Sequence, residues 1–181
     1  MIFVETELKG VFTIALERFE DERGFFALSW SAAEFARRGL DPCLAECNIS
    51  FNKKKGTLRG MHYQETPHGQ TKIVRCTMGS LYDVVIDLRA GSPTFRKWIG
   101  LELTARNHLA LYVPKDFAHG FQTLEDKTEI VYQMSDPYIP GSGRGVRWND
   151  PAFAIQWPDN AAVIISERDR TYPGFLNTDL F

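Results

Sequence analysis

Short apolar segments that alternate with polar residues run through most of the chain. They are rich in β-branched and aromatic residues, and turn-forming residues separate several of them, for example Met78-Gly79-Ser80 and Ala90-Gly91-Ser92-Pro93. This pattern is typical of strands in a β-sandwich or β-barrel. The predicted strands cover residues 11–17, 43–51, 71–77, 81–88, 98–103, 109–113 and 128–134. We therefore expect an all-β fold.

One segment has a helical pattern instead. Ser31 and Glu34 have the spacing of a capping box, helix-favouring alanines lie between and after them, and Gly39 follows as a stop signal. A second, weaker helical signal lies near the C-terminus. The stretch 135–150 is rich in Gly, Pro and Ser. It is expected to be a loop inside the domain, because the apolar pattern resumes at Phe153.

Length and composition fit one globular domain over residues 1–181, with 44% apolar and 24% charged residues and no visible repeat or linker. The 21 basic and 23 acidic residues are interspersed, and the net charge is −2. This balance argues against a nucleic-acid partner and against an anionic membrane surface, both of which need a basic field. An anionic ligand would have to be held by a few placed arginines.

The expected location is the cytoplasm. No apolar run approaches the ~20 residues of a membrane helix, and the N-terminal sequence MIFVETELKG lacks the charged start of a signal peptide. The cysteines are Cys43, Cys47 and Cys76. Their odd number argues against a disulfide framework, and no second pair completes a zinc site. They are predicted to be small buried residues.

Two of the four histidines have unusual neighbours. His62 lies in Arg59-Gly60-Met61-His62-Tyr63-Gln64, and His119 lies in Phe117-Ala118-His119-Gly120-Phe121. Each is close to a glycine and to apolar or aromatic residues, which suggests the wall of a tight cavity. For each one, a purely structural histidine with its hydrogen bonds satisfied is the alternative interpretation.

Strand alternation brings further polar groups to the interior. Lys72 shares a face of its strand with valine and cysteine, and Tyr132 shares a face with isoleucine and methionine. Asp83 and Asp87 share another face and need partners if they are buried. The alternatives are an edge lysine and a core tyrosine without chemistry. An inward histidine, lysine and tyrosine would form an acid–base set suited to chemistry beside a carbonyl group.

A series of motifs follows in a fixed order from about residue 10 to residue 173. They are Asp21-Glu22-Arg23-Gly24-Phe25-Phe26, Asn48 with Ser50, Gly56-Thr57-Leu58-Arg59-Gly60-Met61-His62-Tyr63-Gln64, Gln70-Thr71-Lys72-Ile73-Val74-Arg75, Asp83-Val84-Val85-Ile86-Asp87-Leu88-Arg89, Ser92-Pro93-Thr94-Phe95, Phe117-Ala118-His119-Gly120-Phe121, Tyr132 with Tyr138, Trp148-Asn149-Asp150-Pro151 and Trp157-Pro158. Together they resemble the dTDP-4-dehydrorhamnose 3,5-epimerase family, the RmlC-type branch of the cupins. The resemblance implies a cupin-type jelly-roll β-sandwich with a few short helices.

The same resemblance implies an enzyme without metal or cofactor. The general cupin metal site uses two close histidines, a glutamate and a distant histidine. Here the first motif reads His62-Tyr63-Gln64, so the second histidine is missing. His119 alone cannot hold a catalytic metal, which speaks against a cupin dioxygenase.

The family acts on a nucleotide-linked 4-keto-6-deoxy sugar, whose C4 ketone acidifies the hydrogens on C3 and C5. By resemblance, His62 is the base that removes each proton to give an enolate. Tyr132 is the acid that returns a proton to the opposite face. Asp169 orients the histidine, and Lys72 stabilises the enolate oxygen.

The resemblance also implies a set of substrate-binding residues, namely Arg23, Glu46, Asn48, Arg59, His119, Tyr138 and Arg168. In this reading His119 and Tyr138 line the sugar site, and Arg59 binds the diphosphate. Arg168 stands where the family often has lysine. Arg23 would reach the nucleotide site of the partner subunit in a homodimer.

The chain departs from the family pattern at a few positions. Leu28 replaces a usual glutamate, Glu46 replaces a usual glutamine, and Gly143 stands where an acid is common. These positions belong to the surroundings of the nucleotide or substrate, so their replacement should alter the hydrogen bonding to the nucleobase, while the catalytic residues are kept.

The leading hypothesis is the conversion of dTDP-4-dehydro-6-deoxyglucose to dTDP-4-dehydrorhamnose. A family epimerase for another nucleotide sugar, or for a single carbon, is the first alternative. A non-catalytic sugar-binding cupin is the second, although binding alone does not require the acid–base set. A ketoisomerase of the same fold would keep a histidine base without needing Tyr132 as the acid.

Overall fold

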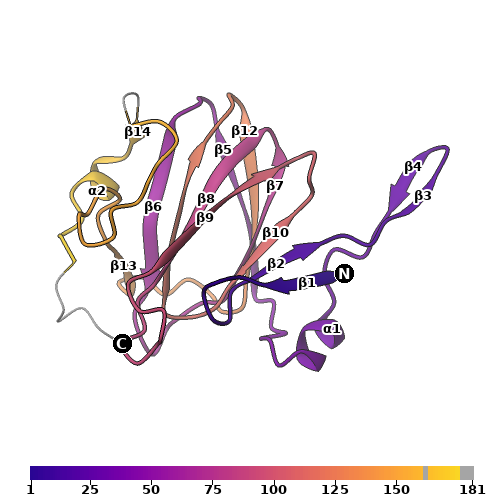
Figure 1. The fold of residues 1–181 in the computed structure, drawn as a ribbon, viewed down its shortest axis with the longest axis horizontal. Helices are drawn as coiled ribbons and strands as arrows, with labels where there is room; N and C mark the ends of the chain where they lie inside the picture. Colours follow the sequence, from indigo (N-terminus) through magenta and orange to yellow (C-terminus); the bar gives the residue numbers. More distant parts are fainter. Residues whose placement is uncertain (161–162, 176–181) are drawn as a thin grey trace.

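Two β-sheets lie face to face in the computed structural model, which describes residues 1–160 and 163–175 (Figure 1). In spatial order, the first sheet consists of β1 (Ile2–Glu5), β2 (Phe12–Ala15), β10 (Ala110–Val113), β7 (Lys72–Met78), β12 (Thr128–Met134) and β5 (Glu46–Asn52). The second consists of β13 (Gly143–Gly145), β6 (Thr57–Gln64), β11 (Phe117–Thr123), β8 (Ser80–Asp87) and β9 (Trp98–Thr104). The short β14 (Ile164–Ile165) adds to β6 in parallel.

Strands β5 to β12 have the connectivity of a jelly roll. Their spatial orders are β5-β12-β7-β10 in one sheet and β6-β11-β8-β9 in the other. The first and last of these strands are therefore neighbours, as in a rolled-up pair of Greek keys. The prediction of an all-β, cupin-type jelly-roll sandwich with a few short helices is confirmed.

The main core fills the space between the two sheets. Its buried residues are Leu8, Val11, Val74, Cys76, Leu81, Val85, Leu103, Leu111, Val113, Phe117, Phe121 and Ile130. The inward rows of β7 and β12 contribute Val74, Cys76 and Ile130 to this core. Because side chains alternate along a strand, the same rows continue into Lys72 and Tyr132. The apolar core and the side chains of Lys72 and Tyr132 thus lie in the same layer between the two sheets.

Two more apolar clusters cover the outer faces of the sheets. The segment that begins at Val146 packs against the second sheet and buries Phe153, Ile155 and Trp157 there. A helix, α1 (Ala32–Arg37), covers the first sheet and buries Phe35. The C-terminal covering segment carries a short helix, α2 (Glu167–Arg170), to the side of β6 (Figure 1).

Both predicted helical signals are confirmed. The side chain of Ser31 accepts a hydrogen bond from the Glu34 amide at 3.4 Å, so the serine caps α1. The Glu34 carboxylate pairs with Arg37 and Arg38 at 2.7 Å. At the weaker C-terminal signal, Ser166 caps α2 in the same way, through the Asp169 amide at 3.1 Å.

Each predicted strand corresponds to an observed one, but the short strands β1, β3, β4 and β14 and the two long strands β6 and β11 were not predicted. The two long ones matter most for the site. Each has a glycine in its middle, and glycine is unfavourable in strands. The reason for the glycines is a close approach of the two strands. A Cβ on Gly60 would lie 2.6 Å from the Gly120 Cα, and a Cβ on Gly120 would lie 2.7 Å from the Arg59 carbonyl oxygen. The prediction of a loop over 135–150 also needs correction, since it includes β13.

The cysteine prediction is wrong for two of the three residues. Cys76 is buried, but Cys43 and Cys47 are exposed. Cys47 lies on β5, at the edge of the first sheet, and alternation turns its side chain to the outside together with Ile49 and Phe51, which are 69% and 47% exposed. Periodicity alone does not tell which face of an edge strand is covered.

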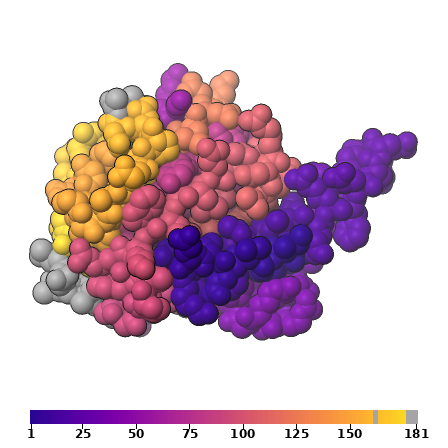
Figure 2. Space-filling view, viewed as in Figure 1, coloured from indigo at the N-terminus to yellow at the C-terminus, as the bar shows by residue number. Residues whose placement is uncertain are grey.

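A two-stranded hairpin projects from the body of the protein. It consists of β3 (Phe19–Asp21) and β4 (Gly24–Phe26), and Figures 1 and 2 show it extending away from both sheets. Arg23 lies in its turn. In the described part of the chain, no helix has the length and apolar character needed to cross a membrane.

Candidate active site

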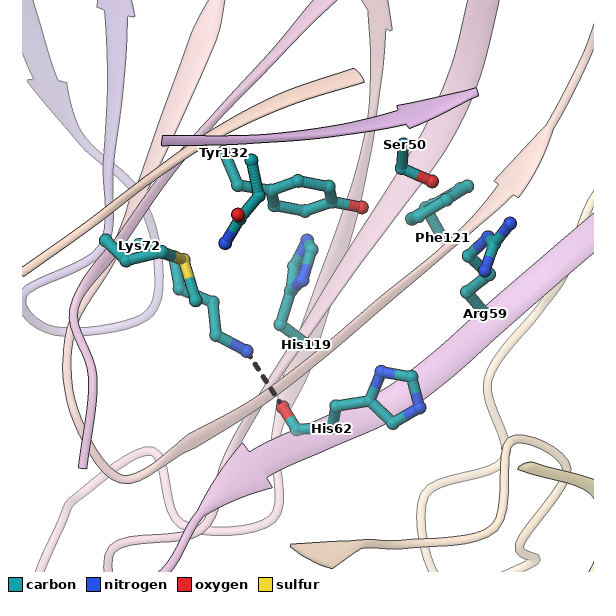
Figure 3. A pocket seen from close by; sticks show the side chains of 9 residues that line it. Ser50, Arg59, His62, Lys72, His119, Phe121 and Tyr132 are labelled. Atoms are coloured by element: carbon teal, nitrogen blue, oxygen red, sulfur yellow. Dashed lines mark hydrogen bonds between the residues drawn. The ribbon is translucent and has the colours of Figure 1, made fainter. Parts of the chain in front are cut away.

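A cavity of about 280 Å³ opens between the sheets, beyond the end of the main core (Figure 3). We call it the central cavity. Its lining residues are Asn48, Ser50, Arg59, His62, Lys72, His119, Phe121, Tyr132 and Met134. They come from β5, β6, β7, β11 and β12, so both sheets contribute. The two histidines are register partners on neighbouring strands.

His62 is held by a carboxylate from the C-terminal segment. Its Nε2 lies 2.8 Å from Oδ1 of Asp169, and Oδ2 of Asp169 accepts a hydrogen bond from the Gly60 amide at 3.2 Å. Because the carboxylate accepts from Nε2–H, the neutral ring keeps a free lone pair on Nδ1. That nitrogen can act as a base.

Burial governs the charge of this pair. It lowers the pKa of the His62 imidazole below its usual value, although the Asp169 carboxylate acts in the other direction. For Asp169, burial acts to raise the pKa, but the hydrogen bond with His62 and the other contacts hold the pKa below its usual range. A neutral histidine beside an ionised aspartate is the state of a general base ready to take a proton.

Lys72 enters the same cavity from β7. Its Nζ donates to the backbone carbonyl of His62 at 3.3 Å, as the dashed line in Figure 3 indicates. Burial lowers its pKa to about 8, while the charge of Asp83 opposes this effect. The ammonium is therefore still mostly protonated near neutral pH, in surroundings where its charge acts strongly.

His119 and Asp83 form a second buried pair. The His119 Nε2 lies 2.9 and 3.0 Å from the two Asp83 oxygens, and both residues are at most 4% exposed. Asp83 thus has the partner that a buried carboxylate requires. The sequence showed that Asp83 shares a strand face with Asp87 and would need a partner if it were buried, but it gave Asp83 no part in a site. His119 lies 36 positions away, so no local pattern pointed to this pair.

Tyr132 lies over the His119 ring. The two ring centroids are 6.1 Å apart, with an edge-to-face angle of 79°. Burial raises the pKa of the Tyr132 phenol well above its usual range, and the charge of Asp83 acts in the same direction. The hydroxyl therefore stays protonated at any physiological pH, and it projects into the central cavity (Figure 3).

The far end of the central cavity is polar. The Arg59 Nε donates to the Asn52 side-chain oxygen at 2.9 Å, which fixes the guanidinium beside Asn48 and Ser50. Arg59 and Asn48 were predicted as site residues. Ser50 appeared only as a motif residue, and Phe121 and Met134 had no sequence signal beyond strand alternation.

A second cavity of about 210 Å³, the adjoining cavity, shares His62 and Lys72 with the first. Its other lining residues are Tyr63, Gln64, Gln70, Tyr138, Gly143, Arg144 and Arg168. The predicted residues Tyr138 and Arg168 therefore lie here. A Cβ on Gly143 would lie 3.2 Å from the Arg168 Nη2, so the glycine leaves space in front of the guanidinium.

The remaining predicted positions lie outside both cavities. The Glu46 carboxylate accepts a hydrogen bond from the Tyr138 amide at 3.3 Å. Arg23 is 84% exposed at the tip of the hairpin, where it pairs with Asp21 at 2.5 Å. Leu28 lines a separate hollow near the base of the hairpin, with Met1 among its neighbours. The chain does not bring Arg23 or Leu28 to its own central cavity.

Over residues 1–160 and 163–175, no group of three or more His, Cys, Asp or Glu side chains could hold a metal ion. A base, a buried cation and a protonated phenol can together remove a proton next to a carbonyl group and return one.

The comparisons with known proteins point to one family. The sequence model of the family described as dTDP-4-dehydrorhamnose 3,5-epimerase matches residues 5–177. A dTDP-4-dehydrorhamnose 3,5-epimerase of Sinorhizobium fredii (strain NBRC 101917 / NGR234) is 40% identical over 173 residues, which cover 96% of this chain and 89% of the relative.

Solved structures give the same result. The crystal structure of dTDP-4-dehydrorhamnose 3,5-epimerase from Elizabethkingia anophelis NUHP1 matches with a TM-score of 0.94 and 40% identity, over 97% of this chain and 96% of that chain. The dTDP-6-deoxy-D-glucose-3,5-epimerase RmlC from Legionella pneumophila Philadelphia 1, solved in complex with dTDP-4-keto-L-rhamnose, matches with a TM-score of 0.86 and 36% identity, over 93% and 89%.

Proposed function

This chain belongs to the dTDP-4-dehydrorhamnose 3,5-epimerase family, and we propose that it converts dTDP-4-dehydro-6-deoxyglucose to dTDP-4-dehydrorhamnose by epimerisation at C3 and C5. The observation that carries this proposal is the central cavity, which His62, Lys72 and Tyr132 line together while Asp169 binds the His62 ring from behind. The relative from L. pneumophila binds dTDP-4-keto-L-rhamnose, which is the product of this reaction.

In the proposed mechanism, His62 removes the proton from the carbon next to the ketone. The electron pair of the broken C–H bond moves into the enolate, and the proton goes to Nδ1. Asp169 stabilises the imidazolium that forms, because its carboxylate already accepts the hydrogen bond from Nε2.

The enolate charge develops on the C4 oxygen. Lys72 is the cation proposed to stabilise it, since its ammonium is buried and fixed by the His62 carbonyl before substrate binds. His119 lines the sugar site in this proposal, held in place by the Asp83 carboxylate.

Tyr132 completes the inversion by donating its hydroxyl proton to the opposite face of the enolate. The resulting phenolate then recovers a proton, and His62 releases the one that it took, so the protein returns to its starting state. The raised pKa of Tyr132 drives this recovery strongly. Two such cycles invert C3 and C5.

The diphosphate needs cations outside the reacting centre. Arg59 in the central cavity and Arg168 in the adjoining cavity are the residues proposed for it, since a guanidinium makes paired hydrogen bonds to phosphate oxygens. Asn48 and Tyr138 are proposed as further substrate contacts. Glu46 is proposed to act next to Tyr138, whose amide it binds.

Deuterium incorporation tests the reaction directly. In heavy water, dTDP-4-dehydro-6-deoxyglucose should take up deuterium at both C3 and C5 and yield the sugar inverted at both carbons. The rate should survive chelation by EDTA, because the proposed mechanism uses protein side chains alone. Both outcomes are measured by NMR of the sugar.

The same assay separates the alternatives. A sugar-binding cupin would leave the hydrogens in place, a single-carbon epimerase would invert one carbon, and a ketoisomerase would move the carbonyl group. The corresponding uridine, cytidine and guanosine diphosphate sugars serve as further substrates, because Leu28 and Glu46 differ from the usual family residues. Loss of the rate in EDTA with recovery on one divalent ion would contradict the metal-free mechanism.

We also propose that the chain forms a homodimer in which Arg23 reaches the partner's active site. The hairpin that carries Arg23 has strands of three residues each and projects from the body. An isolated hairpin is at best marginally stable in water. This one exposes Phe19 and Phe26, at 70% and 75%, so a second copy of the chain would explain its apolar surface.

The cytoplasmic location stays a prediction.

Mixed dimers test the position of Arg23. His62→Ala and Arg23→Ala chains, each nearly inactive alone, should regain activity when coexpressed. A mixed dimer contains one site with both His62 and the partner's arginine, so random pairing restores about a quarter of the wild-type sites. Pairing His62→Ala with Lys72→Ala is the matched control, since both defects lie in the same chain's cavity and no regain is expected. If the Arg23→Ala mixture also stays inactive, Arg23 does not act across the dimer.

A further inference from the structure

Tyr172 packs against the side of the His62 ring. It follows α2 directly, and its ring meets the imidazole edge to face, with the centroids 5.9 Å apart and an angle of 70°. Neither the motifs nor strand alternation gave any sign of this contact. Tyr172 lines neither the central nor the adjoining cavity, and it meets the site through His62 and through Arg168, whose guanidinium carbon lies 5.9 Å from the centre of the Tyr172 ring.

The backbone next to His62 leaves a space that this ring fills. Gly145 of β13 is the register partner of His62 on β6. A Cβ at Gly145 would lie 2.5 Å from two atoms of the Tyr172 ring. A side chain at this position would therefore displace the ring. The Tyr172 ring thus occupies the space that a side chain at position 145 would need.

One short segment supplies both neighbours of the imidazole. Asp169 binds Nε2 from within α2, and Tyr172 follows three residues later, just after the helix. A single hydrogen bond fixes the position of one ring nitrogen but leaves the plane of the ring free to turn. An aromatic ring at the side of the imidazole restricts that rotation, because edge-to-face packing has a preferred geometry.

We propose that Tyr172 is a positioning residue for His62: its ring holds the plane of the imidazole and excludes water from that side. The inference rests on the proposed role of His62 as the base. It concerns the tyrosine ring, and the hydroxyl has no part in it. With the ring in place, Nδ1 stays aimed at the carbon from which it removes the proton.

Removing the ring should also change the pH dependence. The titratable groups that act on His62 are Asp169 from α2, Lys72 from β7 and His119 from β11. Burial is the main reason why the pKa of His62 is low. Water entering in place of the ring would raise this pKa towards its usual value. Since the base works only when unprotonated, the acid limb of the rate profile should move to higher pH.

The experiment compares Tyr172→Ala with Tyr172→Phe. The alanine variant should lose about 10-fold in kcat, because the base is misaligned, whereas a change in KM would report the separate contact of the ring with Arg168. Its acid limb should lie at higher pH than that of the wild type. The phenylalanine variant should restore both quantities. Phe175→Ala is the matched control, because Phe175 packs against Phe153 in the same segment without touching His62.

Each other outcome overturns the proposal in a defined way. If Tyr172→Ala lowers the melting temperature but leaves the pH profile and kcat unchanged, the ring only packs. If Tyr172→Phe is as impaired as Tyr172→Ala, the hydroxyl acts and the ring does not. Should Tyr172→Ala fail to fold, Tyr172→Leu keeps the apolar volume without the flat ring and must show the same loss. An unimpaired His62→Ala protein would instead remove the proposed function itself.

Discussion

The His62→Ala variant is expected to lose hydrogen exchange at both C3 and C5 by ~10²–10⁴-fold, the range commonly found on removal of a general base. The imidazole that pairs with Asp169 is the base proposed for both carbons, so both exchange rates should fall together. The measurement is deuterium uptake from heavy water by the 4-keto sugar, recorded separately at each carbon by NMR.

The fold should survive this change. The His62 side chain lines both cavities and is 39% exposed there, so its removal leaves little empty volume in the core. His68→Ala is a suitable control, because His68 is an exposed histidine near the same strand and lines neither cavity. Near-normal exchange in a folded His62→Ala protein would exclude His62 as the base. Loss at one carbon alone would show that a second base serves the other.

Alternation along single strands put Lys72 and Tyr132 on the same faces as apolar residues, while an edge lysine and a core tyrosine without chemistry stayed open as alternatives. Lys72 and Tyr132 continue rows of apolar residues on β7 and β12, and these rows are buried in the main core. Successive side chains of a strand point to opposite faces of the sheet. Lys72 and Tyr132 therefore point inward when their neighbours on the same face are buried. The same logic showed that Asp83 would need a partner if its face of the strand were buried.

The strands that carry His62 and His119 were harder to predict, because each of them contains a glycine. Gly60 and Gly120 weaken the local β signal of β6 and β11, yet both are required by the close approach of the two strands. The packing of the two strands against each other therefore requires glycine at these positions, although glycine by itself disfavours a strand. His62 and His119 lie side by side because of this contact.

Partners that lie far apart in sequence cannot be read from any local pattern. Asp169 lies 107 positions from His62, and only the resemblance to the family connected them in advance. Tyr172 has no counterpart in the motifs, so packing alone reveals it. Cys47 shows the same limit on the outside of the molecule, because an apolar row on an edge strand does not tell whether another layer covers it.

The Tyr132→Phe variant should separate enolisation from inversion. Phenylalanine keeps the ring and its edge-to-face contact with His119, so the cavity should stay intact. The hydroxyl is the proposed proton donor on the face opposite His62. Without it, His62 can still remove the proton, exchange it with heavy water and return a deuteron to the same face. Deuterium uptake should therefore continue while the yield of inverted sugar falls, by ~10²-fold or more.

Both quantities can be measured by NMR in one sample, so differences in protein concentration or folding cancel. Lys72 remains in this variant, and with its pKa near 8 it still stabilises the enolate at neutral pH. Uptake should then stay within a few-fold of the wild-type rate, and the ratio of inversion to uptake reports the acid step alone. If inversion and uptake were both unimpaired, Tyr132 would only pack against His119. If both fell equally, the hydroxyl would be needed for forming the enolate, and the donor to the opposite face would have to be another group.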